Sequence, residues 1–77
     1  MDNQQIEEIK NKYVKNIEEL TQAKQPDFRK KLDECKDLEE LKEFAKEDRE
    51  YWKKEGRDWD HDFYFDMANC VPNELLS

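Results

Sequence analysis

The stretch IEEIKNKYVKNIEEL, residues 6–20, decides the fold class. Its apolar side chains recur at intervals of three, four, four and three residues: Ile6, Ile9, Tyr13, Ile17 and Leu20. This spacing follows one face of an α-helix, while charged residues fill the other face. The stretch therefore predicts an amphipathic helix from about Asn3 to Ala23. Gln25-Pro26 should end it, because a residue before proline avoids the α region.

A second and a third helix are predicted downstream of Pro26, which suits the first position of a helix. Phe28, Leu32 and Cys35 fall four and three residues apart, and Asp37 with Glu40 forms a capping-box pattern. We therefore expect a break near Lys36-Asp37, between helices 26–36 and 38–55. One continuous helix from Pro26 to Glu55 is the alternative, since no Gly or Pro interrupts it.

The third segment should end at Gly56, a residue suited to the left-handed conformation that closes many helices. A fourth helix is expected from Asp58 or Asp60 to about Cys70. On such a helix Trp59, Phe63 and Met67 share one side, because they are four residues apart. Residues 71–73 should end it, and residues 74–76 could add one packed turn.

These segments predict an all-α protein, a compact bundle of three to four short amphipathic helices in a single domain spanning residues 1–77. A β-fold is disfavoured because the chain has one Gly, two Pro and 45% charged residues. The main core candidates are Ile6, Ile9, Tyr13, Ile17, Leu20, Phe28, Leu32, Leu38, Leu41, Phe44, Trp52, Trp59, Phe63 and Met67.

Negative charge is concentrated in the second half of the chain, whose overall net charge is −7. Residues 1–32 hold six acids and seven bases, whereas residues 33–77 hold fifteen acids and seven bases. The last twenty residues hold five acids and no Lys or Arg. Such a surface repels phosphate and attracts basic proteins. Direct binding to nucleic acid or to an anionic membrane is therefore disfavoured.

The chain is expected to be cytoplasmic. Its first ten residues, MDNQQIEEIK, carry acids where a secretion signal needs an apolar segment, and no run is long enough to span a membrane. Cys35 and Cys70 lack a CxxC pattern. In a reducing compartment they should be small buried thiols rather than a disulfide, although sequence leaves the pairing open.

The alternating acids Asp58, Asp60 and Asp62 do not form a calcium loop. An EF-hand that began at Asp58 would need Gly where Phe63 stands and Glu where Asn69 stands. His61 is one imidazole among carboxylates, short of the usual zinc set. The chain also lacks a glycine-rich phosphate loop and a paired nucleophile and base. We therefore expect no enzyme activity, no metal site and no cofactor.

The same region interleaves acids with aromatic side chains, as in protein-binding surfaces. Carboxylates can attract Lys and Arg over long range, and exposed Tyr and Trp can anchor the contact. The order YWKKEGRDWD, residues 51–60, resembles the partner-binding stretch of small acidic immunity proteins that neutralise nuclease bacteriocins, with Lys where that family has proline. The predicted partner-binding residues are Glu50, Tyr51, Glu55, Asp58, Trp59, Asp60, Asp62, Tyr64 and Asp66.

The leading functional hypothesis is a small acidic phage or bacterial protein that binds and blocks a basic surface of another protein, such as a nuclease. Its role would be that of an anti-defence inhibitor, an antitoxin or an immunity protein, acting as a nucleic-acid mimic. A homodimeric or adaptor bundle that meets another helix through its apolar stripes is the first alternative. A metal-dependent regulator using Asp58, Asp60, His61 and Asp62 is the second.

Overall fold

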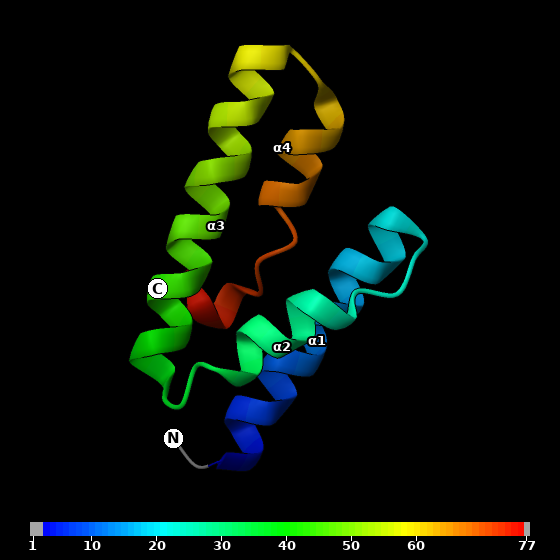
Figure 1. Cartoon of the computed structure of the whole chain (residues 1–77). Coiled ribbons are helices and arrows are strands. Elements are labelled where there is room, and N and C mark those ends of the chain that lie inside the picture. The colour runs from blue at the N-terminus through cyan, green and yellow to red at the C-terminus, as the bar shows by residue number, and fades with distance from the viewer. Residues whose placement is uncertain (1–2, 77) are drawn as a thin grey trace.

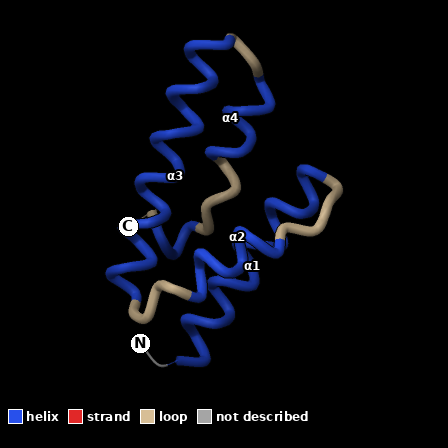
Figure 2. Tube along the Cα trace, viewed as in Figure 1, coloured by secondary structure: helices blue, strands red, loops and turns tan. Residues whose placement is uncertain are grey.

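The computed structural model describes residues 3–76. They form four α-helices, α1 (Asn3–Thr21), α2 (Pro26–Asp33), α3 (Leu38–Trp59) and α4 (Asp62–Ala68), and a 3-10 turn, η1 (Asn73–Leu75). No strand occurs within this range, which confirms the predicted all-α bundle. Figure 1 shows two helical hairpins, α1 with α2 and α3 with α4. The trace in Figure 2 shows the chain after α4 returning to the lower half of α3.

The first helix follows the predicted stripe. Ile6, Ile9, Tyr13 and Ile17 are all buried, because the face that they share packs toward α2 and α3. The helix ends at Thr21, two residues before the predicted end, because Gln22 takes a left-handed conformation with φ of 56°.

The predicted break between the second and third helices is confirmed. Asp37 is the N-cap of α3, and its Oδ1 accepts a hydrogen bond from the backbone N–H of Glu40 at 2.8 Å. The Glu40 side chain reaches back, as expected, but accepts from the backbone N–H of Lys36 at 2.7 Å. Two donors at the start of α3 are thereby satisfied, which fixes where the helix begins. The alternative of one continuous helix is wrong.

The predicted end of the third helix at Gly56 is wrong. Gly56 is buried inside α3, which continues to Trp59, and Asp60 is the left-handed residue that ends it, with φ of 50°. A Cβ added to Gly56 would lie 2.9 Å from two atoms of the Phe65 ring. The glycine therefore lets α4 approach α3 closely, rather than closing the helix.

The fourth helix is consequently shorter than predicted and starts at Asp62 instead of Asp58 or Asp60. Its predicted Trp59–Phe63–Met67 stripe is divided between two helices. Met67 is buried, whereas Trp59 is 70% exposed and Phe63 is 36% exposed, so these two aromatic residues are not part of the core.

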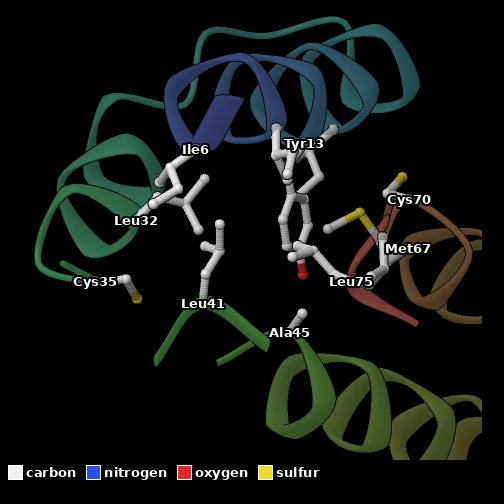
Figure 3. Close-up of a cluster of buried hydrophobic side chains, with 12 residues drawn as sticks. Ile6, Tyr13, Leu32, Cys35, Leu41, Ala45, Met67, Cys70 and Leu75 are labelled. Atoms are coloured by element: carbon white, nitrogen blue, oxygen red, sulfur yellow. The ribbon is translucent and has the colours of Figure 1, made fainter. Parts of the chain in front are cut away.

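The core lies between the hairpins and is centred on Tyr13, Leu32 and Leu41, which are fully buried (Figure 3). Apart from Trp59 and Phe63, the other predicted core residues are buried or packed against this cluster. The core also includes side chains that were not predicted, namely Ala45 of α3 and, from the end of the chain, Ala68, Val71 and Leu75. The predicted final turn is present as η1, and Leu75 packs into the core.

Cys35 and Cys70 are both free and buried, as the sequence predicts. Burial raises the pKa of each thiol, which keeps both protonated. The Cys70 Sγ lies 3.7 Å from the backbone oxygen of Asn16, and the Cys70 carbonyl accepts a hydrogen bond from the Asn16 side chain at 3.0 Å. These contacts attach the end of α4 to α1.

Candidate interaction surface

The α3–α4 hairpin projects from the rest of the molecule and ends in a tight turn, at the top of Figure 1. We call residues 55–63 the hairpin tip; they include the last turn of α3, Asp60 and His61, and the start of α4. The Asp60 backbone N–H bonds to the carbonyl of Gly56 and completes α3. His61 is the N-cap of α4, and its Nδ1 accepts from the backbone N–H of Phe63 at 3.1 Å.

A row of aromatic rings supports the tip on one side of the hairpin. The rings of Trp52 and Tyr64 are stacked, with centroids 5.7 Å apart and an interplanar angle of 16°. Tyr51 packs edge-on against Trp52, and the His61 ring lies 5.5 Å from that of Tyr64. The rings join α3 to α4 by direct contact, which fixes the angle of the hairpin.

The aromatic row is anchored to the core by one half-buried carboxylate. Asp48 accepts hydrogen bonds from the Trp52 Nε1 at 3.1 Å and from the Tyr13 hydroxyl at 2.7 Å. Burial raises the pKa of Asp48, and the two hydrogen bonds partly offset this effect. Burial and the neighbouring carboxylate also raise the pKa of Tyr13, so its phenol stays protonated and donates. Asp48 thus links α1 to the hairpin.

The structure brings together most of the predicted partner-binding acids at the tip. Asp58, Asp60 and Asp62 are exposed and Glu55 is half-buried, and none of the four forms an ion pair with any residue of the range 3–76. Each carboxylate is therefore available to a partner. Arg57 is the one Lys or Arg of the tip, which has a net charge of −3 with His61 neutral.

The predicted aromatic anchors differ in how well they are exposed. Trp59 is 70% exposed at the tip, and Tyr51 is 54% exposed about two turns earlier on α3. Tyr64 is half-buried in its stack with Trp52, so it mainly supports the hairpin. Phe63, an exposed tip residue, was not among the predicted anchors, because the sequence pattern assigned it to the core.

Two predicted acids lie away from the tip. By the 100° turn per residue of an α-helix, Glu50 lies on the side of α3 opposite the buried side chains of Leu41, Ala45 and Trp52. Asp66 is exposed one turn further along α4 than Asp62. The predicted set therefore does not form one continuous surface, and Glu50 belongs to a different face.

Within residues 3–76, the His, Cys, Asp and Glu side chains form no group of three or more that could hold a metal ion. The Nδ1 of His61 is used in capping α4. The apolar stripe of the adaptor alternative is also occupied, because Ile9, Tyr13 and Ile17 are buried within the chain itself.

None of the helices in the described part of the chain is long and apolar enough to cross a membrane. Comparisons of this chain with protein-family models, with curated proteins and with solved structures found no significant match.

Proposed function

We propose that the hairpin tip binds a basic surface of another protein, one that handles nucleic acid, and blocks it. The observation that carries this proposal is the position of Trp59. Tryptophan is the largest side chain in proteins, and Trp59 is 70% exposed at the end of a projecting hairpin. Asp58 and Asp60 lie on either side of it in the sequence.

An exposed tryptophan beside carboxylates suits a partner rich in Lys and Arg. The indole face attracts cations, and its apolar area gains free energy when a partner removes it from water. Trp is also among the residues that most often dominate binding at protein interfaces. Phe63, also at the tip, would extend the apolar contact, and Tyr51, about two turns earlier on α3, is a further exposed ring.

The carboxylates of the tip would supply long-range attraction and specificity. Asp58, Asp60 and Asp62 lie within five positions and have no ion pair to residues 3–76 that a partner would have to break. Clustered negative charge speeds encounter with a positive surface and repels nucleic acid itself. Surfaces dense in Lys and Arg commonly hold phosphate groups, so occupying one would exclude its nucleic acid.

This mode of action suits a cytoplasmic anti-defence inhibitor, an antitoxin or an immunity protein of a phage or bacterium. The test begins with pulldown of nucleases and polymerases from host extract by the full chain. The captured protein is then purified, and its complex with the chain is measured directly. We expect added DNA or RNA to displace the chain, and the complex to weaken as salt is raised.

Two variants of the tip test its role, namely Trp59→Ala and the triple change Asp58→Asn, Asp60→Asn, Asp62→Asn. Each should weaken the complex at least about tenfold, on the scale of an interface hot spot. The matched control neutralises three exposed acids elsewhere, Glu8→Gln, Glu34→Gln and Glu47→Gln, and should leave most of the affinity. Unchanged binding by both tip variants would remove the proposal.

A further inference from the structure

A second charged surface lies on α3, on the side away from α4, and shares only Arg57 with the hairpin tip. Six charged residues follow one another at intervals of four, three, four, three and four: Glu39, Glu43, Lys46, Glu50, Lys53 and Arg57. We call these six residues the α3 stripe. Alternating intervals of four and three keep side chains on one face over a long helix, as in coiled coils.

The α3 stripe faces away from the core. At 100° per residue its mean direction lies about 140° from that of the buried side chains of α3. Lys53 is half-buried and the other five residues are exposed. In Figure 1 α3 forms one edge of the molecule, and η1 lies beside its lower half, where Leu75 and Leu76 border the same hollow as Lys46 and Glu50.

None of the six side chains forms an ion pair with another residue in the described range 3–76. The ion pairs among residues 3–76 involve α1, α2 and Glu74, and none includes a member of the stripe. Instead, like charges adjoin at both ends of the stripe, with Glu39 and Glu43 four residues apart and Lys53 and Arg57 four residues apart. Like charges at this spacing oppose helix formation.

The order of the charges is self-complementary when it is read in opposite directions. If a second α3 lies antiparallel, with residue i opposite residue 96 − i, Glu39 meets Arg57, Glu43 meets Lys53, and Lys46 meets Glu50. All six positions then face the opposite charge. In a parallel pair in register, every residue would face its own like charge.

The helix dipole explains only part of this order. Acids in the first turn of α3 and a base in the last turn both stabilise a helix by itself. The dipole does not require the charges to share one face, nor does it require the central pair of Lys46 with Glu50. These two features favour an external helix as the complement of the stripe.

Apolar surface lies beside the middle of the stripe. A hollow of about 330 Å³ is bordered there by Lys46, Glu50, Leu75 and Leu76. Leu76 is 46% exposed, so the core does not cover it fully. In the antiparallel register the twofold axis passes near residue 48, and each copy would bring its Leu76 close to that axis. The second copy would thus cover apolar area as well as pair charges.

We propose that two copies of this chain associate through antiparallel pairing of their α3 stripes. A C2 arrangement of this kind uses the same surface on both copies, so it closes and does not extend into fibres. Exposed ion pairs are individually weak and are screened by salt, so the dimer should be in fast exchange and sensitive to ionic strength. Of the hairpin tip it uses Arg57 and none of the carboxylates.

Charge reversal tests the pairing on the full chain. Variant A carries Glu39→Lys and Glu43→Lys, and variant B carries Lys53→Glu and Arg57→Glu. Two copies of the same variant would place like charges opposite each other at four of the six positions. A pair of one A and one B places opposite charges against each other at all six. By sedimentation equilibrium at about 50 mM salt, we expect dimers for the unmodified chain and for the mixture, and monomers for A and B separately. Raising salt to about 500 mM should weaken both dimers at least about tenfold.

The control carries Glu8→Lys and Glu34→Lys, which change the net charge as variant A does but lie outside the stripe; it should dimerise like the unmodified chain. Circular dichroism of A and B separates loss of pairing from loss of helix. Orientation is read by disulfide trapping, in which Glu39→Cys should cross-link to Arg57→Cys and not to itself. A chain that is monomeric at millimolar concentration and low salt, or a mixture of A and B no more dimeric than A alone, would overturn the proposal.

Discussion

The base of the bundle and the hairpin tip differ in how their large side chains are covered. At the base, where α1 and α2 meet the first half of α3, Leu32 and Leu41 are fully buried. At the tip, Trp59 is mostly exposed and Phe63 is partly exposed. The difference indicates that the base supplies most of the stability, whereas the tip is free to carry residues chosen for contact with a partner.

The largest expected effect compares two truncations of apolar side chains, one in each region. Leu41→Ala removes a fully buried side chain and should lower the free energy of unfolding by about 2–5 kcal/mol. Trp59→Ala removes more atoms, yet it should change that free energy by no more than about 0.5 kcal/mol, because the indole has few contacts to lose. Urea unfolding followed by circular dichroism measures both. Equal losses would mean that the tip is part of the core.

A second prediction concerns Asp48, which connects the two regions. Tyr13→Phe removes the donor to Asp48 Oδ2 and leaves a half-buried carboxylate with one partner, Trp52. The expected loss at pH 7 is about 1–3 kcal/mol. In an Asp48→Asn background the same change should cost less, because no buried charge is left unsatisfied; equal costs in the two backgrounds would show that the hydroxyl contributes by packing alone.

The pH dependence of the Tyr13→Phe variant follows from the direction in which the pKa of Asp48 is shifted. The pKa of Asp48 in the folded chain lies above its ordinary value of 3.8, so the folded state binds the proton more tightly than the unfolded state does. The contribution of this group to stability therefore increases as pH falls through the folded-state pKa and is lost as pH rises. The deficit of Tyr13→Phe relative to the unmodified chain should shrink on acidification, and a deficit that grows would contradict this assignment.

A third prediction addresses the close approach of α4 to α3. In Gly56→Ala, the added Cβ meets the Phe65 ring at 2.9 Å and should cost about 1 kcal/mol after the gain in helix propensity is counted. In a Phe65→Ala background the obstruction is absent, and the same change should stabilise the chain by up to about 1 kcal/mol. Urea unfolding of the four proteins gives the interaction energy. If Gly56→Ala changes the free energy of unfolding in the same direction in both backgrounds, Gly56 does not serve this packing.

The sequence predicted the base more accurately than the tip for a physical reason. At the base, each apolar residue of the stripe from Ile6 to Ile17 is buried, and Pro26 at the first position of α2 and the Asp37 cap of α3 are local signals. The shape of the tip depends on whether α3 ends at Gly56 or at Asp60. Gly56 carries the stronger local signal, but its packing against Phe65 decides the outcome, and that contact is invisible in sequence.

The error at Gly56 carried over to the candidate site. Ending α3 at Gly56 assigned Trp59 and Phe63 to one buried stripe, whereas the observed turn at Asp60 separates them and exposes both. The acids Asp58, Asp60 and Asp62 were recognised from composition alone, which is insensitive to helix boundaries. The assignment of Glu50 required knowing which face of α3 is buried.

The smallest expected effect tests the turn itself. Asp60 ends α3 with φ of 50° and ψ of 52°, a conformation that costs less for glycine than for other residues. Asp60→Gly should therefore raise the free energy of unfolding by about 0.5–1 kcal/mol. Gln22→Gly, at the corresponding turn after α1 with φ of 56°, is the matched control and should give a similar gain by urea unfolding.

Because Asp60→Gly removes one tip carboxylate while strengthening the fold, it also separates stability from binding. A more stable chain that binds the partner less tightly is the expected combination, and a loss of stability would show that the Asp60 side chain contributes more to the turn than its backbone strain costs.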